Sequence, residues 1–158
     1  GGETEMLRAG DEISDTQGSV DLMRLIGSFV NQTKEPVKED EAAHGQMCVV
    51  KKHGLASLTK FKVLERFTLP AGRESFAYVE CRPETGRMHQ IRVHLADEGC
   101  PVVGDKKYGS SAAKEKGLGI KRLMLHAASL TIIHPHSKRE MTFSTELPSN
   151  FESLLRGA

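Results

Sequence analysis

The sequence has no long apolar run, few cysteines and no obvious targeting segment. The most apolar stretches, such as Leu130–Ile133, are far too short to span a bilayer, and no basic-then-apolar signal peptide opens the chain. The three cysteines form no C-x-x-C pair, so reduced thiols are expected rather than a disulfide framework. These absences favour a cytoplasmic protein with no membrane segment.

Signatures of several enzyme classes are also missing. The sequence contains no G-x-x-x-x-G-K-[ST] phosphate loop and no G-x-S-x-G nucleophile elbow. His89 and His94 are five residues apart, so they lack the H-x-x-x-H spacing of a helical zinc site, and no cysteine has a partner at ligand spacing. The sequence therefore gives no sign of a zinc site, a nucleotide phosphate loop or a serine nucleophile.

Charge is distributed unevenly along the 158 residues. Residues 1–46 hold four Lys/Arg against ten Asp/Glu, whereas residues 47–158 hold 18 against 11. The net charge of +1 therefore conceals a basic region behind an acidic one. A basic surface attracts polyanions, most often nucleic acid, although the same side chains could serve solubility alone. The chain is divided accordingly into an acidic, largely irregular segment at 1–46 and a basic domain at 47–158.

Hydrophobic spacing predicts an α+β fold with a mainly antiparallel, mixed sheet and a few helices. Loops are expected at 1–17 and 31–46, with a more apolar strand or docking segment between them at 18–30. Strands are predicted at 47–52, 59–67, 75–81 and 140–146, and in the apolar stretch 122–135, which Pro135 ends. The second and third of these are predicted to form a hairpin through the turn at Leu69–Gly72.

Two helices are predicted, at 85–98 and from Pro148 onward. In the first, Met88, Ile91 and Leu95 form one apolar stripe, Thr85 is the expected N-cap, and Gly99 suits the C-terminal end. In the second, Ser149 and Glu152 have the spacing of a capping box, and Phe151, Leu154 and Leu155 are the expected anchors.

The densest cluster of candidate functional residues lies in the first predicted helix. Arg87, His89, Arg92 and His94 fall within eight residues, after a glycine that allows close backbone approach. This pattern suits recognition of phosphates or of one acidic side chain, and the alternative is a merely solvated basic face. Asp105 could be a catalytic carboxylate, although holding its own turn as an Asx motif is the favoured interpretation.

Four sequence blocks, in order, resemble the RluA family of RNA pseudouridine synthases. The family pattern runs P-x-T-G-R-x-H-Q-[IL]-R-V-H, then G-x-P-[IL]-x-G-D-x-x-Y-G, then L-H-A-x-x-L-x-F-x-H-P, then P-x-x-F. The corresponding blocks here are R-P-E-T-G-R-M-H-Q-I-R-V-H-L-A at 82–96, G-C-P-V-V-G-D-K-K-Y-G at 99–109, R-L-M-L-H-A-A-S-L-T-I-I-H-P at 122–135 and L-P-S-N-F at 147–151. The resemblance covers roughly residues 47–155.

The resemblance implies conversion of uridine to pseudouridine in rRNA or tRNA, with no metal or cofactor. An aspartate assists cleavage of the glycosidic bond, and a neighbouring arginine keeps that aspartate ionised. By motif position the arginine is Arg92, while Arg87, His89 and Lys106 are candidates for RNA-backbone or structural contacts. Core positions are expected to include Leu125, Ile132 and Phe143.

The chain departs from the family in lacking the His-Arg-Leu-Asp block that carries the nucleophilic aspartate, and the Lys-x-Tyr segment. It therefore looks like the C-terminal part of a catalytic domain, inactive alone, whose partners are RNA and the N-terminal half of the same domain. Arg92 is then expected to have no acidic partner in this chain. Two alternatives stay open, namely a non-catalytic RNA-binding module and a small-anion-binding enzyme.

Overall fold

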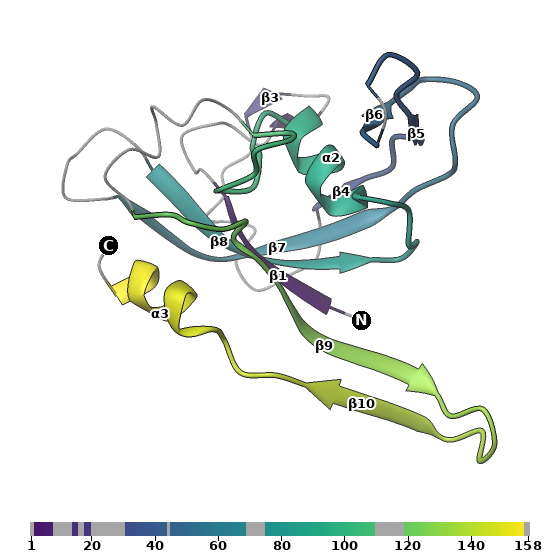
Figure 1. Ribbon diagram of the computed structural model, residues 1–158, viewed down its shortest axis with the longest axis vertical. Coiled ribbons are helices and arrows are strands. Elements are labelled where there is room, and N and C mark those ends of the chain that lie inside the picture. The colour runs from purple at the N-terminus through teal and green to yellow at the C-terminus, as the bar shows by residue number, and fades with distance from the viewer. Residues whose placement is uncertain are drawn as a thin grey trace.

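The computed structural model describes residues 2–7, 14–15, 18–19, 31–43, 45–68, 75–109 and 119–156. Its main sheet has six strands in the order β10-β9-β1-β8-β7-β4. These strands are β1 (Gly2–Leu7), β4 (Asn31–Thr33), β7 (Thr59–Thr68), β8 (Ser75–Pro83), β9 (Leu125–Ile133) and β10 (Glu140–Ser144). Every strand pair in this sheet is antiparallel, and the described ranges also contain two helices, which agrees with the α+β fold that the sequence predicts (Figure 1).

Four short strands form two separate ribbons. Strand β2 (Ser14–Asp15) pairs with β3 (Gly18–Ser19), and β5 (Val37–Glu39) pairs with β6 (Met47–Val49). The prediction of an exposed loop at 31–46 is therefore wrong at β4 and β5, where Val37 is fully buried. The expected loop at 1–17 is likewise wrong for Gly2–Leu7, because β1 pairs with β8 on one side and β9 on the other. The division of the chain at residue 47 stays a prediction.

The β7–β8 hairpin is the platform for the first helix. Phe61 and Val63 alternate with Lys60 and Lys62, so one face of β7 is buried while the lysines form ion pairs with glutamates at the surface. This confirms the predicted hairpin, although its turn at Leu69–Gly72 lies outside the described residues, as do 20–30 and 110–118.

Helix α2 (Gln90–Asp97) packs on this platform through Ile91 and Leu95. It begins five residues later than the sequence suggests, and the expected cap Thr85 bonds instead to the side chain of Gln90. Met88 lies outside the helix and is largely exposed, so only two members of the predicted stripe are buried. Gly99 adopts the left-handed conformation at the C-terminal end, as predicted.

Helix α3 (Ser149–Arg156) packs through Phe151 on a second core cluster that contains Phe76, Val103 and Met124. Leu154 and Leu155 flank that cluster, which confirms all three predicted anchors. The β5–β6 ribbon adds a third cluster, in which Val37 and Met47 contact Val93 of α2.

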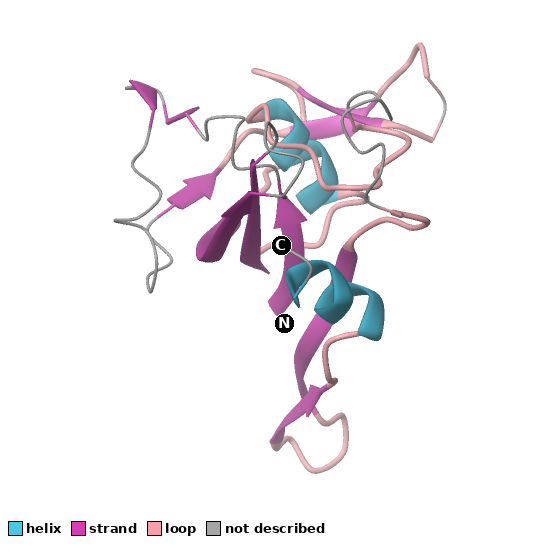
Figure 2. Cartoon of the chain, turned by 90° about the vertical axis from the view of Figure 1, so that its left-hand side faces the viewer, coloured by secondary structure: helices cyan, strands magenta, loops and turns pink. Residues whose placement is uncertain are grey.

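The β9–β10 hairpin extends away from the body of the molecule (Figures 1 and 2). Cross-strand pairing places Leu130 opposite Phe143 and Ile132 opposite Met141, so these four side chains share one face. All four are substantially exposed, from 38% for Met141 to 54% for Leu130. The expectation that Ile132 and Phe143 are core residues is therefore wrong, whereas Leu125 does pack against the first cluster.

Candidate functional site

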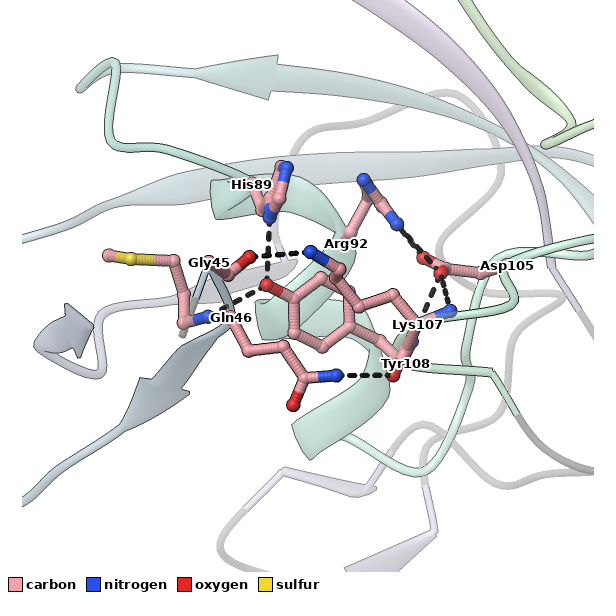
Figure 3. A network of polar contacts seen from close by, with 8 residues as sticks. Gly45, Gln46, His89, Arg92, Asp105, Lys107 and Tyr108 are labelled. Atoms are coloured by element: carbon pink, nitrogen blue, oxygen red, sulfur yellow. Dashed lines mark hydrogen bonds and ion pairs between the residues drawn. The ribbon is translucent and has the colours of Figure 1, made fainter. Parts of the chain in front are cut away.

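The centre of the site is a two-point ion pair between Arg92 of α2 and Asp105. Arg92 Nε donates to Asp105 Oδ2 at 2.8 Å, and Nη2 donates to Oδ1 at 2.9 Å (Figure 3). The carboxylate side chain is fully buried, whereas 19% of the arginine side chain is exposed. Paired N–H···O bonds fix the plane of the guanidinium as well as its distance. This corrects the expectation that Arg92 has no acidic partner in this chain.

Asp105 is held equally firmly by its own turn. Its Oδ1 accepts the backbone N–H groups of Lys107, at 2.9 Å, and of Tyr108, at 3.0 Å, which confirms the predicted Asx motif. Burial raises the pKa of the Asp105 carboxyl, but the hydrogen bonds from Arg92 and from these two N–H groups outweigh it, and the net pKa lies below the usual value. Asp105 is therefore an ionised anchor for the guanidinium.

Tyr108 lies between the other polar groups of the site. Its ring centroid is 5.0 Å from Arg92 Cζ, so the cation stacks over the aromatic face. Its hydroxyl accepts the backbone N–H of Met47 at 2.8 Å and contacts His89 Nδ1, also at 2.8 Å. One side chain thus contacts both the arginine and the histidine that the sequence proposes as site residues (Figure 3).

His89 immediately precedes helix α2 and has left-handed backbone angles, with φ of 53°. That conformation is uncommon for a residue with a side chain, and it turns the imidazole toward Tyr108. Burial is the main cause that lowers the pKa of His89, and the nearby charges of Arg92 and Lys107 lower it further against an opposing effect of Asp105. The imidazole is therefore neutral at physiological pH.

A closing segment, Gly45–Met47, covers the turn that carries Asp105. Lys107 Nζ donates to the carbonyl of Gly45 at 2.6 Å, and Gln46 Nε2 donates to the carbonyl of Lys107 at 3.4 Å. Together with the Met47 N–H on Tyr108, these bonds join residues about 61 positions apart in the sequence. The β5–β6 ribbon is thereby attached to the site.

The start of α2 is fixed by a buried polar network that the sequence analysis did not identify. Gln90 accepts hydrogen bonds from Thr85 and from the N–H of Arg87, and donates to Leu58 and Thr59 of the neighbouring strand region. His94 Nε2 donates to the carbonyl of Glu35 at 2.8 Å, so its Nδ1 accepts from the Thr59 hydroxyl. His94 is therefore a structural histidine.

The structure brings together two of the four residues proposed as site residues. His89 and Arg92 meet at Tyr108, whereas Arg87 donates to the carbonyl of Ala56 and Lys106 is exposed on the Asp105 turn. Tyr108 was missed, although its place in G-D-K-K-Y-G, next to the candidate Asp105, was an available signal. Within the described ranges, no cluster of three or more His, Cys, Asp or Glu is arranged to hold a metal ion, and no helix is long and apolar enough to cross a membrane.

Comparison with known proteins identifies relatives of this chain. A family described as RNA pseudouridylate synthase matches residues 23–97, which include Arg87, His89 and Arg92. Ribosomal large subunit pseudouridine synthase C of Haemophilus ducreyi is 34% identical over 131 residues, covering 81% of this chain and 39% of the relative. Ribosomal large subunit pseudouridine synthase D of Neisseria meningitidis is 38% identical over 135 residues, covering 80% of this chain and 34% of the relative.

Two solved structures share the fold. Human RNA Pseudouridylate Synthase Domain Containing 1 matches with a TM-score of 0.65 and 29% identity over 93% of this chain. Human RNA Pseudouridylate Synthase Domain Containing 4 matches with a TM-score of 0.62 and 25% identity over 99% of this chain. The present chain spans 54% and 60% of those two structures, and between a third and two fifths of the two bacterial relatives.

Proposed function

Because this chain belongs to the RNA pseudouridine synthase family, we propose that it forms part of a catalytic domain that isomerises uridine to pseudouridine in RNA. The observation that carries the proposal is the family match across the segment that holds His89 and Arg92. The names of the bacterial relatives favour ribosomal RNA of the large subunit as the substrate. Such a protein would act in the cytoplasm, where ribosomal RNA is made and modified in bacteria.

The proposed role of Arg92 is to keep the catalytic aspartate ionised. A carboxylate beside a guanidinium titrates at a lower pKa than one alone, and a guanidinium can contact more than one carboxylate. Asp105 would hold the plane of Arg92 while the catalytic aspartate binds beside it. The target uridine would have to leave its stack to reach this site.

The nucleophilic aspartate is proposed to come from sequence outside this chain. The His-Arg-Leu-Asp block of the family does not occur among the 158 residues, and the curated relatives are more than twice as long as the matched region. The uncovered apolar face of the β9–β10 hairpin supports the same proposal, because a sheet face of this kind is normally packed against another element. The partner would be the N-terminal half of the same catalytic domain.

Tritium release from RNA labelled at C5 of uridine tests this proposal. The purified chain alone should give no turnover, and the chain together with the N-terminal half of a relative such as the Neisseria synthase should restore it. An Arg92→Ala chain should fail to restore turnover, while Arg156→Ala, at an exposed position of α3, should restore it fully. Turnover by the chain alone that is lost on changing Asp97 or Asp105 would place the nucleophile here and refute the proposal.

A non-catalytic RNA-binding module is the second candidate, and the absent aspartate block favours it. Both candidates require RNA binding with steep salt dependence, because phosphate contacts release counterions. They differ in the complementation assay, since a binding module stays inactive when the second half is supplied. The small-anion enzyme has less support, because Asp105 already occupies two donors of Arg92.

A further inference from the structure

We propose that Tyr108 is the positioning residue of the site: it holds His89 as the tautomer with its proton on Nε2 and supports the guanidinium of Arg92. This tautomer offers RNA an uncharged N–H donor, and in that respect the inference rests on the proposed function. The G-D-K-K-Y-G motif marks Tyr108 by its position but does not say which residues it contacts. The inference comes from three contacts made by one side chain.

The hydroxyl of Tyr108 has a single proton, and its partners decide where that proton goes. The oxygen already accepts the backbone N–H of Met47, a group that can only donate. Its own proton is therefore available for His89 Nδ1, 2.8 Å away. A nitrogen that accepts carries no proton, so the neutral imidazole carries its proton on Nε2.

The surroundings of His89 favour the neutral ring that this arrangement needs. The charged groups that act on it are Arg92 on helix α2 and Lys107 and Asp105 on the following turn, and burial adds to the effect of the two cations. Protonation would place a proton between Nδ1 and a hydroxyl that already accepts one hydrogen bond. Tyr108 thus disfavours both the protonated imidazole of His89 and the neutral tautomer with its proton on Nδ1.

The same phenol ring limits how Arg92 can move. The carboxylate of Asp105 fixes the guanidinium in its plane, and the ring of Tyr108 covers one flat side at 5.0 Å. Rotation of the arginine would break both contacts at once. Tyr108 therefore couples the geometry of the cation to that of the histidine, and the N–H of Met47 couples both to the closing segment.

The ring nitrogens of His89, observed by NMR in the ¹⁵N-labelled chain, test the inference directly. The wild-type chain should show an unprotonated Nδ1, a protonated Nε2 and a titration midpoint below the ordinary value of about 6.5. Tyr108→Phe should populate both tautomers and raise the midpoint, because the neutral ring loses its donor. Tyr78→Phe removes the hydroxyl of the chain's other tyrosine and should leave both readings unchanged. A protonated Nδ1 in the wild-type chain at neutral pH would overturn the inference, whatever the variants do.

Two further readouts separate positioning from mere packing. Tyr108→Leu should speed solvent exchange of the Arg92 Nε proton, whereas Tyr108→Phe, which keeps the ring, should not. Binding to a short uridine-containing stem-loop RNA should weaken about two- to tenfold in Tyr108→Phe, with an unchanged salt slope because no charge is lost. Unchanged tautomer, midpoint and affinity in Tyr108→Phe would refute the role of Tyr108. A wild-type chain that binds no RNA would refute the proposed function instead, and the tautomer would still decide the positioning role.

Discussion

Arg92 and Asp105, thirteen positions apart, form a two-point ion pair in which the acid is completely buried and the base remains partly exposed. This difference in burial matters because each side chain would respond differently if its partner were removed. A guanidinium at the surface can be solvated, whereas a buried carboxylate cannot. The pair is therefore part of the fold as well as of the proposed site.

Arg92→Ala should destabilise this chain by about 3 kcal/mol, because it leaves the Asp105 carboxylate buried without its cation. If Arg92 had no acidic partner, the same substitution would change the stability of the chain much less. Urea unfolding followed by circular dichroism measures the change. Arg87→Ala removes a guanidinium whose Nε donates to the carbonyl of Ala56 at the surface, and it should cost less than about 1 kcal/mol. Equal stability of Arg92→Ala and wild type would show that the ion pair is not formed in solution.

The stability of the chain should fall as the pH drops below about 6.5. Burial lowers the pKa of His94, so the unfolded chain takes up a proton before the folded chain does. The stabilising effect of the neutral ring is fully present above the pKa of the unfolded state and is lost as the pH falls toward the folded pKa. His89 contributes in the same direction.

Urea unfolding at pH 7.5 and at pH 5.5 measures this dependence. His94→Gln should be less stable than wild type at both values but should show a flatter dependence on pH. His136→Gln, at an exposed position in the tip of the β9–β10 hairpin, serves as the matched control and should keep the wild-type slope. A wild-type chain that is as stable at pH 5.5 as at pH 7.5 would contradict the neutral, buried state of His94.

Phe143→Ser should change the unfolding free energy of this chain by no more than about 0.5 kcal/mol, because the ring is half exposed on the β9–β10 hairpin. It should nevertheless weaken binding of the N-terminal half in a pull-down or calorimetric titration, if that half covers the apolar face. Thr142 lies on the opposite face of the same strand, where it bonds to Thr131, so Thr142→Ser serves as the control. This control should bind the N-terminal half normally, and equal binding by Phe143→Ser would exclude the face as the contact.

Gly104→Ala should destabilise the chain by roughly 2 kcal/mol or more. Gly104 has φ of 77°, and a methyl group there would collide with the backbone carbonyl of Arg122. Gly86→Ala is the matched change at a glycine whose added methyl group would meet open space, and it should cost less than about 0.5 kcal/mol. The melting temperatures of both variants are compared by thermal unfolding. Similar melting temperatures would contradict the left-handed backbone and the close approach at Gly104.

Local sequence patterns predicted the elements whose cause is local. Alternation identified the buried face of β7, and the turn chemistry of Asp105 identified the Asx motif. The start of α2 was misjudged because the side chain of Gln90 bonds to Thr85 and to the preceding backbone, and no propensity encodes that competition. Ile132 was misjudged for another reason: alternation shows which face of a strand is apolar but not whether anything covers it.

The site residues likewise divide into those that local sequence predicts and those whose roles depend on tertiary contacts. Arg92 and His89 were found by motif, but the partner of Arg92 and the role of Tyr108 depend on how the Asp105 turn folds back onto α2. The link from Met47 to Tyr108 spans 61 residues, and one sequence without relatives gives no signal for a hydrogen bond from a backbone N–H. Such contacts require the three-dimensional structure.

The spacing of the contacts at Tyr108 implies an order of events during folding. The ion pair closes a loop of 13 residues, whereas the bonds from Gly45–Met47 close loops of more than 60, at a larger entropic cost. On the ribosome, residues 45–47 emerge first and can pair within the β5–β6 ribbon, but their bonds to Lys107 and Tyr108 must wait until the entire β7–β8 hairpin and the turn behind α2 have been synthesised. The closing segment therefore docks late, and changes in it should speed unfolding in stopped-flow experiments while leaving the refolding rate nearly unaltered. In a nascent chain the arginine and the histidine, whose contacts with the Asp105 turn span only 13 and 19 residues, would accordingly be held in place before the ribbon that later encloses them.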